Sequence, residues 1–414
     1  MIELDKSGFK LQHLETEEDV RQNLMLMRVV FGERTGVDKL VQKLIDHHPS
    51  MTLHDFLVVK HEGKFVASVA LIPVTWSVGD VQLKVAELGM VATLPEYRRR
   101  GLIRRLVDEY HRQVGEQGYD LSVLEGIPYF YRQFGYEYAV PLLEETRIRL
   151  GQVPQCESKI SIRPFTLKDL PKAVQLLKLS QRKFYVHSVR SPQIWGIQHK
   201  TKMASDPEPF EAYAVEEEGE ALAYFRMREN PDEKELLLTE VTDVDQRCAQ
   251  TVLNFLKIYG ETHGLETLAA CVSYQEPFSQ HLVAIGATRR LPTYAWQIRI
   301  SDYAKIFWKL KSLFEKRLAG STYRRLTDTL NFNFRKFTIR MTLKDGEVTD
   351  VQRIESGERS PLGFNPLVFV KLLLGDQSRD ELESAYPDCR VDASCKHLVD
   401  VLFPRLPSYI HSAY

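Results

Sequence analysis

Apolar residues in the first 150 positions recur every three to four residues in some segments and every second residue in others. The first spacing predicts amphipathic helices and the second predicts half-buried strands. The predicted order is two helices, a hairpin that turns at Gly63, a strand, a long helix and a short strand. Their ranges are Glu17–Phe31, Val37–His47, Phe56–Val69, Val81–Thr93, Ile103–Val114 and Leu121–Leu124. Strands that are joined through a helix indicate a mixed α/β sheet.

A second unit, over about 161–300, repeats this order of elements. Its hairpin turns at Gly219 and is followed by a strand, a helix and another strand. Gly63 and Gly219 are separated by almost the same number of residues as Gly135 and Gly286. This constant offset indicates duplication of one domain. Chance similarity between two α/β domains is the alternative.

The pattern changes at about Ser301. A helical stripe of apolar residues is followed by an alternating strand that ends at the turn Asp345-Gly346, a hairpin signal. Two further helices are predicted over Pro366–Leu374 and Lys396–Phe403. This part is an α+β domain without a catalytic motif of its own. The predicted fold class is therefore α/β (α+β), with mixed sheets and domains over 1–150, 151–300 and 301–414.

Composition excludes several classes of protein. Of the 414 residues, 43% are hydrophobic and 27% are charged, which excludes a disordered or low-complexity chain. A net charge of −1 gives no electrostatic reason to expect nucleic acid or an anionic membrane as a partner. The five cysteines lack the spacing of a zinc site, and His397 does not complete one with Cys389 and Cys395, so no metal is expected. The longest apolar runs are too short to cross a bilayer, and we expect a cytoplasmic protein.

The segment from Leu88 to Leu106 is the most informative part of the sequence. A strand ends there, Pro95 breaks it, and a turn with three arginines and Gly101 begins a helix. The free amides at the start of a helix, with a glycine that allows close approach, suit a pyrophosphate. Arginines beside them can form charge-assisted hydrogen bonds to phosphates. Without further context, a solvated basic face is an equally good interpretation.

This segment resembles the coenzyme A loop of the GNAT superfamily of N-acetyltransferases. In both, a strand is followed by a turn, here Pro-Glu-Tyr-Arg-Arg-Arg-Gly, and by a helix. The resemblance implies a mixed sheet that splays at the strand Val81–Thr93, along which the pantetheine of acetyl-CoA would bind as an added strand. It also implies that the pyrophosphate rests on the amides from Arg99 through Arg104. The implied cofactor-binding residues are Val91, Ala92, Thr93, Arg99, Arg100, Gly101, Leu102, Ile103, Arg104, Leu124 and Glu125. Ile103 departs from the family's preference for glycine or alanine, which affects the shape of the turn.

A second landmark runs from Glu125 to Tyr136. GNAT domains commonly carry a Phe-Tyr followed by a Gly-aromatic pair, and Tyr131, Gly135 and Tyr136 match it. The resemblance implies that Tyr131 donates a proton to the departing CoA thiolate. A phenol pKa of about 10 and a thiol pKa of about 8.5 make that transfer nearly balanced. The other tyrosines of this stretch are interpreted as packing residues.

The whole layout resembles the enhanced intracellular survival (Eis) family. An intact N-terminal GNAT domain, a degenerate second one and a tail similar to sterol carrier protein would make up its tandem GNAT fold. In the second unit, Asp245–Ala249 stands where the phosphate turn is expected and has no Arg-x-x-Gly, so this half should not bind the cofactor. The resemblance implies that the carboxylate of the terminal Tyr414 is the general base. Glu87 is the competing base, and a frayed tail is the ordinary alternative for a terminus.

These features predict an acetyl-CoA-dependent N-acetyltransferase in which an amine attacks the thioester directly. Backbone near Val91 would polarise the carbonyl, and Tyr131 would protonate the thiolate. The resemblance implies a polyamine-like (aminoglycoside-type) or lysine acceptor, a pocket between the two GNAT units and the tail, and a homo-oligomer, a hexamer. The rivals are a lipid or sterol carrier, favoured by an apolar tunnel in the tail, and a non-catalytic acetyl-CoA-binding protein.

Overall fold

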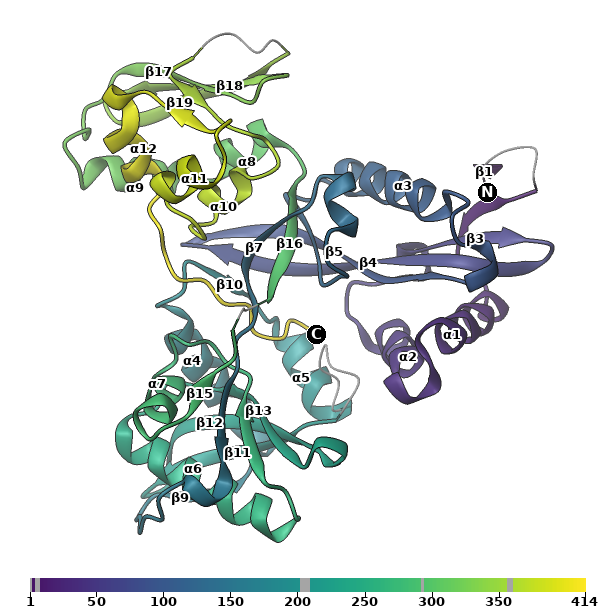
Figure 1. The fold of residues 1–414 in the computed structure, drawn as a ribbon, viewed down its shortest axis with the longest axis vertical. Coiled ribbons are helices and arrows are strands. Elements are labelled where there is room, and N and C mark those ends of the chain that lie inside the picture. The colour runs from purple at the N-terminus through teal and green to yellow at the C-terminus, as the bar shows by residue number, and fades with distance from the viewer. Residues whose placement is uncertain (1, 4–7, 202–208, 292–293, 356–359) are drawn as a thin grey trace.

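Three β-sheets divide the computed structural model into three lobes (Figure 1). The structure describes residues 2–3, 8–201, 209–291, 294–355 and 360–414. Each sheet contains one parallel pair among antiparallel neighbours: β5 with β6, β13 with β14, and β17 with β20. The prediction of mixed α/β sheets is therefore confirmed.

The first sheet has the strand order β1-β2-β3-β4-β5-β6-β16-β7. In addition, β10 pairs with the C-terminal end of β4. Helices α1 and α2 cover one face and α3 covers the other (Figure 1). Side chains alternate accordingly, because Phe56 and Val58 pack with α1 and α2 while Leu57 and Val59 pack with α3. The elements are α1 (Glu17–Phe31), α2 (Val37–His47), α3 (Leu102–Glu116), β1 (Ile2–Glu3), β2 (Lys10–His13), β3 (Phe56–His61), β4 (Lys64–Val78), β5 (Val81–Thr93), β6 (Leu121–Leu124), β7 (Glu137–Leu143), β10 (Val186–Ser188) and β16 (Tyr294–Ile300).

The second sheet has the order β15-β8-β14-β13-β12-β11-β9 and its own apolar core under α6 and α7. Its hairpin turns at Glu218 and Gly219, both with positive φ, as the hairpin of the first sheet does at Glu62 and Gly63. The elements are β8 (Thr146–Arg149), β9 (Ser161–Pro164), β11 (Glu211–Glu217), β12 (Glu220–Asn230), β13 (Glu235–Val241), β14 (Thr267–Ala270), β15 (Thr288–Arg289), α4 (Leu170–Gln181), α5 (Pro192–Thr201), α6 (Gln246–Thr262) and α7 (Pro277–Ala284).

The first two sheets exchange strands. β16 lies in the first sheet between β6 and β7, although its residues belong to the range 151–300. β8 precedes residue 151 and pairs with β14 and β15 in the second sheet. The sheets therefore cross the predicted boundary between the first two ranges, and the two units are tied together by backbone hydrogen bonds.

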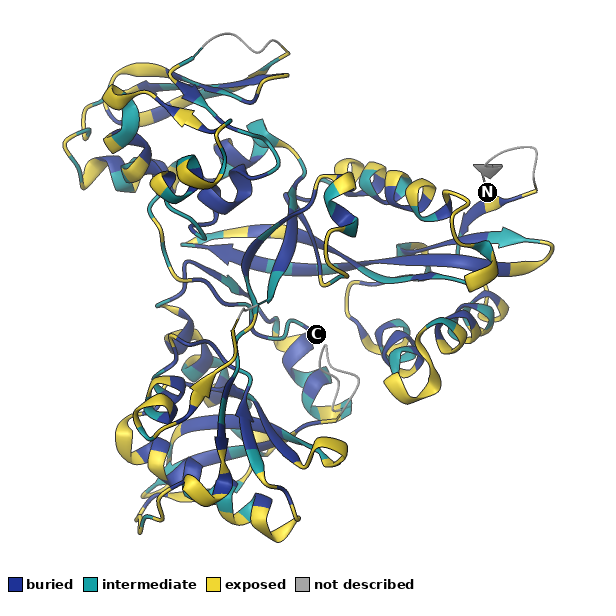
Figure 2. Cartoon of the chain, viewed as in Figure 1, coloured by how far each residue is buried: buried dark blue, intermediate teal, exposed yellow. Residues whose placement is uncertain are grey.

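The third sheet has the order β19-β18-β17-β20-β21. Its interior is filled by aromatic side chains, among them Phe307, Phe332 and Phe369, which are fully buried. After α12 the chain returns to the middle of the molecule, where its last residue is buried (Figures 1 and 2). The elements are α8 (Tyr303–Lys309), α9 (Lys311–Ala319), β17 (Asp328–Asn333), β18 (Thr338–Lys344), β19 (Glu347–Ile354), β20 (Leu362–Gly363), α10 (Phe369–Leu373), α11 (Arg379–Ala385), β21 (Arg390–Val391) and α12 (Lys396–Leu402).

Candidate active site

The first sheet opens along the second half of β5. The parallel pairing of β5 with β6 covers only Val85–Glu87, so the six residues from Leu88 to Thr93 run on past the last paired residue. On the other side, the pairing with β4 is interrupted by a bulge opposite Ser68–Ala70, where Met90 has a positive φ of 54°. Splay and bulge expose backbone groups of β5 on one side, which is the arrangement that an added extended ligand requires.

The turn after β5 leaves the start of α3 without a cap. Gly101, in the left-handed region at φ 75°, precedes the helix and supplies no side chain. Within the described residues, the first backbone N–H there with a backbone acceptor is that of Arg105, which donates to Gly101 at 3.2 Å. The N–H groups of residues 102–104 therefore point out of a 15-residue helix beside three arginines. These free donors and cations fit a pyrophosphate.

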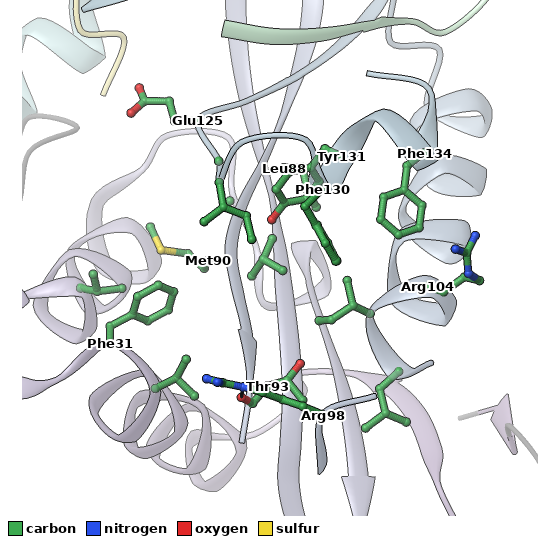
Figure 3. A pocket seen from close by; sticks show the side chains of 18 of the residues that line it. Phe31, Leu88, Met90, Thr93, Arg98, Arg104, Glu125, Phe130, Tyr131 and Phe134 are labelled. Carbon is green, nitrogen blue, oxygen red and sulfur yellow. Dashed lines mark hydrogen bonds between the residues drawn. The ribbon is translucent and has the colours of Figure 1, made fainter. Parts of the chain in front are cut away.

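A cavity of about 930 Å³ runs from this turn along β5 (Figure 3). The predicted residues that line it are Val91, Thr93, Arg99, Gly101, Leu102, Ile103, Arg104, Glu125, Tyr131 and Tyr414. Three other predicted residues do not. Ala92 packs into the core on the α1 and α2 side of the sheet and Leu124 into the core on the α3 side, whereas the guanidinium of Arg100 lies over the ring of Tyr97, 5.2 Å from its centroid. Alternation along a strand accounts for Ala92, since its neighbours face the cavity.

An apolar wall of this cavity has no counterpart in the sequence prediction. Phe31 and Met90 lie on one side of the cavity, and Phe130 and Phe134 lie on the other (Figure 3). Helices α1 and α2 supply further apolar residues, Val30, Val37 and Leu40. Their helical spacing identified them only as apolar positions, because the packing of the helices decides whether such a residue faces core or cavity.

Tyr131 is held by a short helical turn, Phe130–Phe134, that follows the loop after β6. A Cβ on Gly126 would come within 2.5 Å of the Tyr131 ring, so this glycine permits the observed approach. From β16, Gln297 donates to the carbonyl of Gly126 at 3.0 Å and Tyr294 donates to the same oxygen. Burial raises the pKa of Tyr131 to about 12, with a smaller effect from Tyr294. The phenol is therefore protonated at neutral pH, as a proton donor must be.

Glu87 and Tyr414 meet at the inner end of the cavity. The Tyr414 hydroxyl donates to Oε1 of Glu87 at 2.8 Å, and both side chains are buried. Burial, with a contribution from the charge of Glu125, raises the pKa of Glu87 to about 8. The two residues named as competing bases are thus hydrogen-bonded partners. The tyrosine side chain makes this contact, and an oxygen of its terminal carboxylate accepts a hydrogen bond from Ser412 Oγ at 2.9 Å.

A second cavity of about 410 Å³ begins where the first one ends. Glu87, Glu125 and Tyr414 line both cavities. The rest of its lining is partly aromatic, with Trp76 and Trp296, and includes residues of the second sheet and of the C-terminal segment 409–414. The carboxyl–phenol pair therefore separates two compartments, one of which contains the uncapped start of α3.

Among the residues that the structure describes, no helix is long and apolar enough to cross a lipid bilayer. They also contain no group of three or more histidine, cysteine, aspartate or glutamate side chains arranged to hold a metal ion.

Comparison with known proteins assigns the first unit. Residues 13–139 match the acetyltransferase (GNAT) domain family. N-acetyltransferase Eis from Mycobacterium tuberculosis and from Mycobacterium bovis is 42% identical over 72 residues, which cover 16% of this chain and only 17% of the relative.

Solved structures match over nearly the whole chain. A GCN5-related N-acetyltransferase from Anabaena variabilis superposes with a TM-score of 0.73 at 17% identity, covering 98% of this chain and all of that one. Eis1 from Mycobacterium abscessus has a TM-score of 0.65 at 14% identity, with the same coverage. At these identities the likeness shows the fold alone. Residues 13–139 are therefore a GNAT acetyltransferase domain, of the class that uses acetyl-CoA as cosubstrate, in a chain that resembles Eis.

Proposed function

We propose that this protein is an N-acetyltransferase that moves the acetyl group of acetyl-CoA to a primary amine. The observation that carries the proposal is the position of the Glu87–Tyr414 pair between two cavities. One cavity has a free helix start for a pyrophosphate, and the other supplies space for an acceptor. A proton acceptor at the junction of donor and acceptor compartments is what direct transfer to an amine requires.

Each side chain has a proposed role. The N–H groups at the start of α3, with Arg99 and Arg104 beside them, bind the pyrophosphate. Backbone at Val91 polarises the thioester carbonyl. Glu87, ionised above pH 8, takes the ammonium proton, with Tyr414 fixing its orientation. The terminal carboxylate of Tyr414 remains the alternative base.

Tyr131 is proposed to return a proton to the departing thiolate. Its pKa of about 12 lies further from the thiol pKa of about 8.5 than that of a free phenol does. The transfer is therefore less balanced than the sequence alone suggests. The thiolate must remain close to the phenol to be stabilised by its hydrogen bond as the proton moves.

The acceptor is proposed to be a cationic amine. Glu125 borders both cavities and attracts an ammonium group, as Glu87 does once it is ionised, while Trp76 and Trp296 supply aromatic surface for its approach. A polyamine-like molecule of the aminoglycoside type, or a lysine side chain, meets this description. The acceptor class rests on the resemblance to Eis together with these carboxylates.

The three-domain organisation belongs to the same proposal. It comprises a catalytic GNAT unit, a degenerate second GNAT unit and a tail like sterol carrier protein that delivers the C-terminus. The interior of this tail is filled by its own phenylalanines, which disfavours a lipid tunnel and hence a lipid carrier. The structure contains one chain, and the hexamer implied by the resemblance stays a prediction.

The test is release of CoA thiol from acetyl-CoA with a panel of amines, with a reaction lacking amine to measure hydrolysis. Wild type, Tyr131→Phe and a chain ending at Ala413 are compared. The proposal expects amine-dependent release by wild type and a large loss in both variants. Equal activity of all three would refute the mechanism. Binding of acetyl-CoA without turnover of any amine would support a non-catalytic acetyl-CoA-binding protein instead.

A further inference from the structure

The second unit contains a buried arginine that contacts the C-terminal segment. Arg190 follows β10, its side chain is 1% exposed, and its guanidinium carbon lies 4.8 Å from the centroid of the Trp195 ring. Its Nη1 donates to Glu240 on β13 at 3.0 Å, and Nη2 donates to the other oxygen of the same carboxylate. The remaining donor, Nε, donates to the main-chain carbonyl of Ser412 at 2.5 Å. One guanidinium thus joins the second sheet to a residue two positions before the terminus.

The direction of this last hydrogen bond is fixed by Glu240. A guanidinium is planar and rigid, so a carboxylate that binds both of its Nη atoms also sets where its Nε–H points. Glu240 itself accepts from the Tyr224 hydroxyl and lies 3.4 Å from Nε of Arg226. Burial favours the neutral carboxyl group, but the guanidinium groups of Arg190 and Arg226 outweigh it and hold the pKa of Glu240 well below its usual range. The carboxylate therefore stays ionised.

The chain before Ser412 is held along β10, the strand that pairs with β4 of the first sheet, and along the residue that precedes β10. Tyr185 N donates to the Pro407 carbonyl at 2.7 Å, Tyr409 N donates to the Val186 carbonyl at 2.9 Å, and Ser188 Oγ donates to the His411 carbonyl at 2.6 Å. Arg190 makes the last of these contacts before the chain reaches the junction of the two cavities. Beyond it, Tyr414 accepts a hydrogen bond from Ser412 Oγ and donates one to Glu87 Oε1.

A buried ion pair is by itself weak support for a stabilising role, because desolvation offsets most of the attraction between the charges. Orientation of a neighbouring group is the better reason for burying this one. The contacts form a continuous series from Glu240 through Arg190 and Ser412 to Tyr414 and Glu87. No atom of Arg190 lines either cavity, whereas its partner Glu240 lines the second one. An effect of Arg190 on the reaction therefore passes through the C-terminal residues or through Glu240, and removal of Tyr414 separates these two routes.

We propose that Arg190, oriented by Glu240, is a positioning residue that holds the C-terminal segment so that Tyr414 meets Glu87. This rests on the proposed function, since it assumes that Tyr414 takes part in the transfer. It gives the second unit a task that needs no cofactor: its buried arginine places a group that completes the site of the first unit.

The kinetic test is a double-mutant cycle on the full chain, since coupling between two sites shows as non-additive effects. Wild type, Arg190→Gln, a chain ending at Ala413 and the combination are compared in the CoA-release assay. Arg190→Gln is expected to lower kcat about 10- to 100-fold, the cost of a misplaced group, with KM for acetyl-CoA nearly unchanged. In the chain ending at Ala413, the same substitution should have no further effect on kcat. An equal loss in both backgrounds overturns the proposal.

A second measurement does not depend on activity. Carboxypeptidase A removes an accessible terminal aromatic residue, so release of Tyr414, followed by mass spectrometry, reports how firmly the tail is held. Release is expected to be at least tenfold faster in Arg190→Gln than in wild type, and intermediate in Arg190→Lys. Unchanged release overturns the proposal. If wild type transfers no acetyl group but releases Tyr414 as predicted, the proposed function fails while the positioning role stands.

The matched control is Arg379→Gln. Arg379 is another guanidinium with little exposed surface, in the third lobe, where it donates to Asp400 at 2.9 Å and to Glu383 at 2.6 Å, away from the tail. Its substitution should leave kcat and the release of Tyr414 unchanged even if the protein is less stable. Where Arg190→Gln does not fold, Arg190→Lys and Glu240→Gln are measured in the same cycle. Either variant must show the same coupling to Tyr414.

Discussion

The helices α3 and α6 occupy similar places in the first and second units. Their first turns are capped differently. α3 begins at Gly101 and has no side-chain cap. α6 begins after Asp245, whose carboxylate accepts a hydrogen bond from Cys248 N at 2.8 Å. A carboxylate at a helix start satisfies a donor that a phosphate would otherwise bind, and its charge repels an anion.

The surroundings of the two helix starts differ in the same sense. A cavity of about 450 Å³ beside α6 is lined by Glu217, Glu218 and Arg247, and Arg247 is already paired with Glu217. The segment that leads from the first unit into the second also packs against α6, where Lys257 Nζ donates to the Val153 carbonyl at 2.8 Å. The start of α3 therefore has free N–H donors beside arginines, whereas the start of α6 is capped by a side chain of its own unit. The difference is carried by a few residues of the first turn.

The largest effect on activity is expected from removal of the proposed proton donor of the first unit. Tyr131→Phe is expected to lower kcat by about 10²–10⁴-fold, the usual contribution of general acid catalysis. Binding of acetyl-CoA, measured by calorimetry, should change little because the ring remains. The matched control is Tyr274→Phe in the second unit, whose hydroxyl donates to the Arg290 carbonyl at 2.6 Å. If the control loses as much activity as Tyr131→Phe, the chemistry is not confined to the first unit.

Glu87→Gln tests the proton acceptor and should lower kcat about 10²-fold. In wild type, kcat/KM is expected to rise with pH up to about 8, where Glu87 becomes ionised, and this inflection should be absent from the variant. An inflection that persists in Glu87→Gln would assign the base to another group, the terminal carboxylate or the amine itself.

The same variant has an expected effect on stability. The pKa of Glu87 is about 8 in the folded protein and about 4.5 when unfolded, so the folded state holds a proton that unfolding releases between these values. This group therefore makes wild type less stable as pH rises from 4.5 to 8. Glu87→Gln does not lose stability in this way. When the midpoint of thermal unfolding of wild type is subtracted from that of the variant, the difference should therefore be more positive at pH 9 than at pH 5. A constant difference across this range would contradict the raised pKa.

Gly101→Asp gives the first unit the charge that the second unit carries. A carboxylate near the start of α3 interacts with the helix dipole by up to about 2 kcal/mol, so its competition should weaken CoA binding about 5- to 30-fold. Gly101→Asn is the matched control, because asparagine also tolerates the left-handed conformation and has nearly the same shape. Calorimetric titration of both variants with CoA isolates the charge. Equal affinities of the two variants for CoA would show that the start of α3 does not bind the pyrophosphate.

The smallest effect is expected in the second unit. Asp245→Ala removes the cap of α6 and should lower the free energy of unfolding by about 1 kcal/mol. It should leave kcat unchanged and create no second CoA site, since Glu217 and Glu218 remain beside the helix start. Denaturant unfolding and the stoichiometry of CoA binding are the measurements. A stoichiometry of two would mean that the cap alone prevents binding there.

Local patterns determined much of this structure. The helices Glu17–Phe31 and Val37–His47 and the strand Val81–Thr93 lie where the spacing of apolar residues predicts them. The reason is that helix and strand periodicities are set by neighbours within a few residues. The turn proposed to bind the pyrophosphate could be proposed from the sequence, because glycine, arginines and a helix start are adjacent in the chain.

Only the tertiary structure decided which distant segments meet. Strand β16 pairs with β6 and β7, and these partners are selected by hydrogen bonding and packing between segments about 150 or more residues apart. The meeting of Glu87 with the Tyr414 hydroxyl, and of Arg190 with the Ser412 carbonyl, likewise depends on how three sheets are assembled. The burial that raises the pKa of Glu87 is a product of that assembly, since desolvation depends on every segment that packs around the carboxyl group.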